Sequence, residues 1–210
     1  MPLAYVARHG ETDWNREGRY QGQLESTLTQ LGRTQAAALA SALARSGARR
    51  VISSPLARCV QTAAPVAAAL GVEVESDARL LEIAHGTWEG RLRVEIEHAD
   101  AGRMRAWMQE PASVRFDGGE SLDDVAARWL AFTSSLRGNN EDVVIVTHDV
   151  LVRIAVLLAA GRPLTMLWEP RVQNGGYALL SAASQRWKVV EECCDEHLEG
   201  IRADTARQAL

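Results

Sequence analysis

The chain has 210 residues, of which 47% are hydrophobic and 24% are charged, a composition typical of a folded globular domain. Its 23 basic and 27 acidic residues give a net charge of −4, which argues against a protein-wide basic surface for nucleic acid or for a membrane. At this length one hydrophobic core is favoured over two separate domains.

The apolar segments predict a cytoplasmic protein. The chain opens without a charged segment followed by an apolar stretch. The best apolar run, Val150 to Ala160, is interrupted by Arg153 and is too short to span a bilayer.

The cysteines fit the same compartment. Cys59, Cys193 and Cys194 are an odd number without disulfide-framework spacing, which suits reducing conditions. Cys193, Cys194 and His197 are residue types that bind metals, but adjacent residues on a strand point to opposite faces. We therefore expect no metal site there.

Strands and helices are predicted to alternate along the chain. Apolar runs rich in β-forming residues predict strands at Leu3 to Ala7, Arg50 to Ile52, Val72 to Val74 and Val143 to Val146, followed by a hairpin of Tyr177 to Leu180 and Trp187 to Val190. Between them, apolar residues at i, i+3, i+4 and i+7 predict helices whose stripes begin at Ala36, Val60, Leu122 and Leu151. Ser54-Pro55 and the capping box of Ser121 and Asp124 predict two helix starts.

This order predicts an α/β fold, a three-layer αβα sandwich with a mostly parallel central sheet. Residues 1–195 would form one domain. Within it, residues of about 90–119 show only weak hydrophobic periodicity and would form an inserted flap of helix and loop. Residues 196–210 would form a C-terminal tail, either disordered or folded over the site through His197-Leu198-Glu199. The apolar edge near Tyr177 to Leu180 is a candidate surface for a homodimer.

Charged side chains follow two of the predicted strands. Arg8 and His9 come directly after the first, and His148 follows Val143 to Val146. Open α/β sheets bind ligands beyond the carboxyl ends of their strands, so the two histidines face each other if those strands are adjacent. Either histidine alone can equally be structural. Arg58, in the first turn of a predicted helix, sits where free backbone N–H groups attract an anion, although a lone arginine is commonly a surface residue.

Five ordered segments between Leu3 and Arg153 resemble the histidine phosphatase superfamily, which has the phosphoglycerate-mutase-like fold. They are Arg8-His9-Gly10-Glu11-Thr12 with Trp14-Asn15, Gly18-Arg19-Tyr20-Gln21-Gly22 and Leu28-Thr29; Ser53-Ser54-Pro55-Leu56-Ala57-Arg58; Leu81-Glu82 with Gly86 and Trp88; Gly118-Gly119-Glu120-Ser121; and Thr147-His148.

The resemblance implies hydrolysis of a phosphomonoester in two steps, each with a lower barrier than direct attack by water. His9 would be the nucleophile, and Arg8, Arg58 and His148 would surround the transferring phosphoryl group. The resemblance assigns further hydrogen bonds to Asn15 and, less firmly, to Gln21 and Gly22.

Glu82 matches the position of the family's general acid, which protonates the leaving oxygen and later activates water. To hold a proton near neutral pH, the pKa of Glu82 must be raised by burial or by a neighbouring negative charge. Glu11 and Glu89 lie near in sequence, but structural roles are favoured for both. The scheme needs no cofactor and no metal ion, so a metal-independent enzyme is expected.

The phosphatase branch is favoured over the mutases. Mutases of the family carry a longer segment after the acid, with adjacent arginines for the substrate carboxylate, whereas Arg91, Arg93, Arg103 and Arg105 are not adjacent here. Asp149 also replaces the glycine that is usual after the second histidine in mutases.

Within that branch, several stretches are similar to metal-independent phosphoserine phosphatases. They are Gly18 to Gly22, Glu82 to Trp88, Glu110-Pro111 and Phe116 to Leu122. L-Phosphoserine is therefore the expected substrate. His85 would either recognise the organic part of this substrate or be an ordinary loop histidine. His98 is predicted to be a surface residue. The alternatives are a broad-specificity or other sugar or glycerate phosphatase, a phosphoglycerate mutase, and an inactive phosphate-binding module.

Overall fold

The computed structural model describes residues 1–136, 138, 140–183, 186–206 and 208–209. In this part of the chain, six strands form one sheet in the order β3-β2-β4-β1-β5-β6. They are β1 (Leu3–Arg8), β2 (Arg50–Ser53), β3 (Val74–Ser76), β4 (Val143–Thr147), β5 (Tyr177–Ala183) and β6 (Arg186–Cys194). The first four run parallel to one another, and β5 and β6 are antiparallel to their neighbours.

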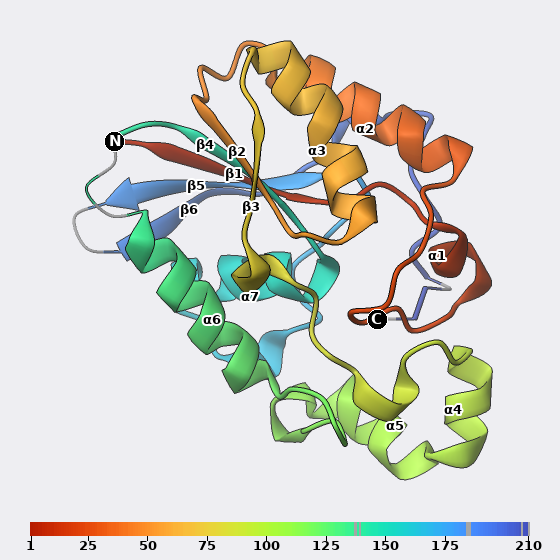
Figure 1. Cartoon of the computed structure of the whole chain (residues 1–210). Helices are drawn as coiled ribbons and strands as arrows, with labels where there is room; N and C mark the ends of the chain where they lie inside the picture. The colour runs from red at the N-terminus through yellow and green to blue at the C-terminus, as the bar shows by residue number, and fades with distance from the viewer. Residues whose placement is uncertain (137, 139, 184–185, 207, 210) are drawn as a thin grey trace.

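Helices cover both faces of this sheet, which confirms the predicted three-layer sandwich (Figure 1). Those of the described residues are α1 (Asp13–Glu17), α2 (Gln30–Leu43), α3 (Ala57–Leu70), α4 (Arg93–Ala99), α5 (Ala101–Gln109), α6 (Leu122–Ser135) and α7 (Asp149–Ala160). In Figure 1, α2 and α3 lie above the sheet and α6 and α7 lie below it.

The two faces of the sheet have separate hydrophobic cores. Tyr5 and Ala7 pack with residues of α2 and α3, whereas Ala4 and Val6 pack with residues of α6 and α7. This alternation follows from the strand geometry, in which successive side chains point to opposite faces. Burial on both faces explains why β1 and β4 are continuously apolar.

The start of α3 differs from the prediction. The helix begins at Ala57 after Leu56, and Ser54 does not cap it. Instead the Ser54 backbone N–H donates to the carbonyl oxygen of Val146, and its hydroxyl oxygen lies 2.8 Å from Nε2 of His148. A tertiary partner therefore takes the hydroxyl group that local sequence assigned to capping. The predicted box of Ser121 and Asp124 is present at the start of α6.

β3 begins two residues later than predicted. Gly71, with φ of +69°, ends α3, and the N–H of Val72 still donates to the carbonyl oxygen of Ala67. The chain is therefore free to enter the sheet only beyond Val72.

The predicted edge hairpin is present, but Tyr177 to Leu180 is its inner strand. The homodimer itself stays a prediction. β5 pairs with β1 on one side and with β6 on the other, so its backbone groups are already used. On this side of the described sheet, the free edge belongs to β6.

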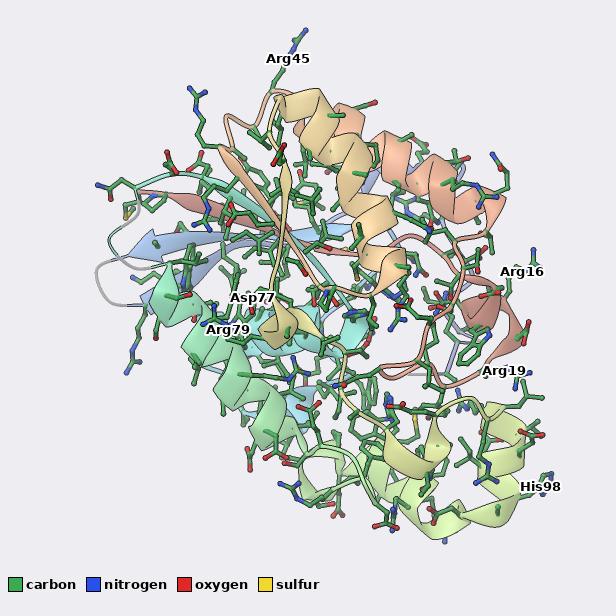
Figure 2. All side chains as sticks on the ribbon, in the orientation of Figure 1. Arg16, Arg19, Arg45, Asp77, Arg79 and His98 are labelled. Carbon is green, nitrogen blue, oxygen red and sulfur yellow. The ribbon has the colours of Figure 1, made fainter. Side chains whose placement is uncertain are left out.

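The flap contains α4, α5 and a short 3₁₀ helix, Pro111–Ser113, joined by loops. Met104 and Trp107 face its interior and are buried. Figure 2 shows His98 pointing outward from the flap, as predicted for a surface residue. Across the described residues, no helix is both long and apolar enough to cross a membrane.

Candidate active site

Two imidazole rings meet at the carboxyl edge of the sheet. His9 follows β1 and His148 follows β4, and these strands are parallel neighbours. The ring centroids are 5.3 Å apart in an edge-to-face arrangement. Both residues are buried, so the two histidines share one enclosed environment.

The His9 ring is held in one tautomer. Its Nδ1 lies 2.7 Å from the carbonyl oxygen of Gly10. A carbonyl oxygen only accepts hydrogen bonds, so Nδ1 carries the proton and Nε2 keeps its lone pair. Burial, followed by the positive charges of Arg58 and Arg8, holds the pKa of His9 well below its usual value. The ring is therefore neutral, as a nucleophile must be.

His148 has polar neighbours on α3 and on the loop before it. Its Nε2 lies 2.8 Å from the hydroxyl oxygen of Ser54 and 3.4 Å from Sγ of Cys59. Burial, and then the charge of Arg58, holds the pKa of His148 well below its usual value.

Both predicted arginines are almost fully buried. Nη1 of Arg8 lies 3.1 Å from Oδ1 of Asp149. Arg58 donates from Nη1 to the carbonyl oxygen of Leu24 and from Nη2 to that of Gly22, at 2.8 and 2.7 Å. Burial lowers the pKa of both guanidinium groups, but from a value high enough to leave them charged.

Arg8, His9 and Arg58 line a cavity of about 10 Å³, and His148 lies beside it behind His9. The cavity is lined by Arg8, His9, Asn15, Gln21, Gly22, Arg58, Glu82, His85 and Ala209. Buried N–H donors on three of these, Nε of Arg8, Nε of Arg58 and Nδ2 of Asn15, have no hydrogen-bond partner among the described residues. Buried donors are normally paired, so three orphan donors around one cavity indicate a site for an anion.

Glu82 lies on the same cavity and is 7% exposed. Burial, and then the negative charge of Asp149, raises its pKa to about 7, against the opposing effects of the Ile83 N–H, Arg58 and Arg128. A carboxyl group with this pKa is protonated in a large fraction of molecules at neutral pH. It can therefore donate a proton and later accept one.

His85 lines the cavity from the flap side. Its ring contacts the rings of Tyr20, Trp107 and Phe116, with centroids 4.7 to 5.9 Å away. Burial lowers its pKa to about 3, so the ring is neutral. Neither ring nitrogen has a hydrogen-bond partner in the described part of the chain.

Gln21 and Gly22 mainly support other residues. Oε1 of Gln21 accepts hydrogen bonds from Thr12 and Ser26. Gly22 has φ of +50°, and a Cβ there would lie 2.1 Å from Oε1 of Glu89, so the position requires glycine.

Glu11 and Glu89, the two other glutamates near the acid in sequence, have structural partners. Glu11 accepts from the hydroxyl of Thr29 at 2.7 Å, and Glu89 accepts from the backbone N–H of His85 at 2.9 Å. Neither lines the cavity.

Sequence reasoning missed two amide side chains. Nδ2 of Asn174 lies 3.3 Å from the carbonyl oxygen of His9 and from Oδ1 of Asn15. Gln208 in the tail accepts a hydrogen bond from Nη2 of Arg8 and donates to Oδ1 of Asn174 at 2.8 Å. Asn174 begins an Asn-Gly-Gly sequence that predicts a turn before the last hairpin, so it could have been found. No sequence pattern around Gln208 indicates its role.

Described residues of the tail pack against the domain. Nε2 of His197 lies 2.9 Å from the carbonyl oxygen of Gly175, and Gln35 donates to the carbonyl oxygen of Ile201. The described residues contain no cluster of three or more His, Cys, Asp or Glu side chains arranged to hold a metal ion.

Comparison with known proteins identifies the family. Residues 4–195 match the pattern described as "Histidine phosphatase superfamily (branch 1)". The chain is 37% identical to phosphoserine phosphatase 1 of Hydrogenobacter thermophilus, covering 89% of each chain. It is 36% identical to glucosyl-3-phosphoglycerate phosphatase of Mycobacterium tuberculosis, covering 87% of this chain and 85% of that one.

Relatives named probable phosphoglycerate mutase also match, at 30% identity. Among solved structures, Bacillus stearothermophilus YhfR superposes with a TM-score of 0.90 at 31% identity, covering 94% of this chain and 100% of that one. The fold, the matched pattern and the similar phosphatases lead to one conclusion: the chain belongs to branch 1 of the histidine phosphatase superfamily and is a phosphatase.

Proposed function

We propose that this phosphatase hydrolyses L-phosphoserine through a phosphohistidine formed on His9. The observation that carries the proposal is the set of orphan N–H donors around the cavity that His9 lines. In the first step, Nε2 of His9 attacks phosphorus, a P–N bond forms, and the bond from phosphorus to the serine oxygen breaks. Arg8, Arg58 and Asn15 donate to the phosphoryl oxygens throughout.

Glu82 serves both steps as acid and then base. Its carboxyl proton moves to the leaving serine oxygen, because an alkoxide is otherwise a very poor leaving group. In the second step, the resulting carboxylate takes a proton from water, which attacks phosphorus and breaks the P–N bond. Phosphate leaves and His9 returns to its neutral form.

His148 stabilises charge on the phosphoryl group beside His9. The neighbouring Ser54 hydroxyl orients the ring, since it lies within hydrogen-bond distance of Nε2. The two guanidinium groups supply the positive charge that a metal ion supplies in other phosphatases. We therefore propose that the reaction is metal-independent and needs no cofactor.

His85 supports an amino-acid substrate. A neutral imidazole has one N–H donor and one acceptor nitrogen, and both lack partners among the described residues. L-Phosphoserine carries a carboxylate and an ammonium group, so the neutral ring can either donate to the carboxylate or accept from the ammonium group. The similarity to a phosphoserine phosphatase supports the same substrate.

The C-terminal tail is proposed to act as a cover. Ala209 lines the cavity and Gln208 occupies Nη2 of Arg8, a donor that the phosphoryl group needs. A cavity of about 10 Å³ has room for roughly one water molecule, so a substrate must displace the tail to enter.

A panel of substrates tests the proposal. L-Phosphoserine, 3-phosphoglycerate, glucosyl-3-phosphoglycerate and p-nitrophenyl phosphate would be compared by steady-state phosphate release, with and without excess chelator. We expect L-phosphoserine to lead in kcat/KM by about tenfold or more, with no effect of chelator. Equal values across the panel would contradict the substrate assignment. Conversion of 3-phosphoglycerate to its 2-phospho isomer with a bisphosphoglycerate primer would indicate a mutase.

A further inference from the structure

Asp149 has an unusual position for a carboxylate, because it contacts Arg8, which lines the proposed anion site. It follows His148 at the start of α7 and is 1% exposed. Its Oδ1 lies 3.1 Å from Nη1 of Arg8, and its Oδ2 accepts a hydrogen bond from Nε of Arg153. A buried negative charge beside a phosphate site opposes anion binding, so it requires an explanation.

The geometry around Arg8 supplies one. Asp149 and the carbonyl oxygen of Val172 contact Nη1, so neither of them occupies the edge formed by Nε and Nη2. Nε has no partner among the described residues, and Nη2 contacts the amide oxygen of Gln208. Two parallel N–H donors on one edge of a guanidinium group match two oxygens of a phosphoryl group.

Arg153 completes the arrangement on the side away from the cavity. Its Nη1 donates to the carbonyl oxygen of Pro170 at 2.6 Å, and its guanidinium group lies 5.3 Å from the ring centroid of Trp168. Because these contacts fix Arg153, they also fix the carboxylate of Asp149 between two cations.

We propose that Asp149 is a positioning residue that aims the Nε–Nη2 edge of Arg8 at the transferring phosphoryl group and keeps a negative charge near Glu82. This inference rests on the proposed phosphatase chemistry. In that reaction Arg8 contacts the phosphoryl oxygens and Glu82 delivers the proton to the ester oxygen. The carboxylate of Asp149 would therefore act on both residues.

The charges around Glu82 determine the sign of the second effect. The charged or titratable groups that face it are Arg8 and His9 after β1, Arg58 and Cys59 of α3, Arg128 of α6, Asp149 of α7 and His85 in its own loop. Asp149 raises the pKa of Glu82, whereas Arg58 and Arg128 lower it. Removing the charge of Asp149 therefore lowers the pKa of Glu82 and reduces the fraction that holds a proton.

The test compares pH profiles of kcat/KM for L-phosphoserine and p-nitrophenyl phosphate in the wild type, Asp149→Asn and Arg153→Gln, with the exposed Asp123→Asn as the matched control. For Asp149→Asn we expect kcat/KM for both substrates to fall on the order of 10–100-fold, because Arg8 loses its orientation. The basic limb for L-phosphoserine should move to lower pH by about one unit.

Arg153→Gln should move the same limb to higher pH, because the charge of Asp149 is then less neutralised. This variant keeps the inference testable if Asp149→Asn fails to fold, which thermal unfolding reports. Asp123→Asn should match the wild type. If the wild type hydrolyses phosphomonoesters and neither variant moves the limb, the inference about Asp149 is wrong; if the wild type hydrolyses none, the proposed function itself is wrong.

Discussion

The floor and the cover of the cavity are built in different ways. The floor is His9, with His148 beside it, at the ends of two hydrogen-bonded strands, and its geometry follows from the register of the sheet. The cover is His85, whose ring packs against Trp107 of the flap, and the tail, in which Ala209 lines the cavity and Gln208 contacts Arg8.

The proposed function assigns the chemistry to the floor and the selectivity to the cover. Groups on a rigid sheet edge suit the bond-breaking step, because small misplacements of a nucleophile are costly. Groups on a flap and a tail can vary without disturbing the sheet, and they suit recognition of the organic part of the substrate. Substitutions in the floor should therefore affect all phosphomonoesters alike, and substitutions in the cover should affect substrates unequally.

The largest effect is expected for His9→Ala in the floor. Without Nε2 no P–N bond can form, so kcat should fall by on the order of 10⁴-fold or more for every substrate. Rapid-quench trapping with ³²P-labelled substrate should give no phosphoenzyme. His98→Ala, on the exposed face of the flap, is the control and should retain both label and rate. A labelled His9→Ala enzyme would place the nucleophile elsewhere.

Glu82→Gln should discriminate by leaving group. Hydrolysis of L-phosphoserine should fall about 10²–10⁴-fold, and that of p-nitrophenyl phosphate much less, because a phenolate leaves without protonation. In the wild type, kcat/KM for the alkyl substrate should decline as pH rises through about 7, where Glu82 loses its proton. The variant should lack that decline. Intact alkyl phosphate hydrolysis would mean that another group is the acid.

A smaller and selective effect is expected for His85→Leu in the cover. The loss of a hydrogen bond to a charged group should lower kcat/KM for L-phosphoserine about 10–100-fold and leave p-nitrophenyl phosphate nearly unchanged. His85→Asn, which keeps a donor and an acceptor, should recover part of the loss. Equal losses on both substrates would reduce His85 to a structural role.

The smallest effect is expected at the tail. Gln208→Ala frees Nη2 of Arg8 and should lower KM for phosphate esters a few-fold, whereas Gln208→Glu should raise KM by placing a competing carboxylate on Arg8. The exposed Gln30→Ala serves as the control. Changes of KM in the same direction for both Gln208 variants would contradict competition between the tail and the substrate.

Much of the fold and the floor could be predicted because their signals are local. Apolar runs identified the parallel strands, and Arg8, His9 and His148 directly follow two of them. Adjacency of β1 and β4 then brought the imidazoles together. Local signals failed where a tertiary partner competed, as for the Ser54 hydroxyl near His148 and for β5, whose second edge is taken by β1.

By itself, the sequence determined the alternation of strand and helix, the two strand-end histidines and the resemblance to a family of phosphatases. Only the tertiary structure decided which nitrogen of His9 is free, how Asp149 holds Arg8, and that Gln208 contacts the same guanidinium group from 200 positions away. Hydrophobic periodicity encodes which face of an element is buried, whereas contacts between distant polar groups depend on how the packed elements meet.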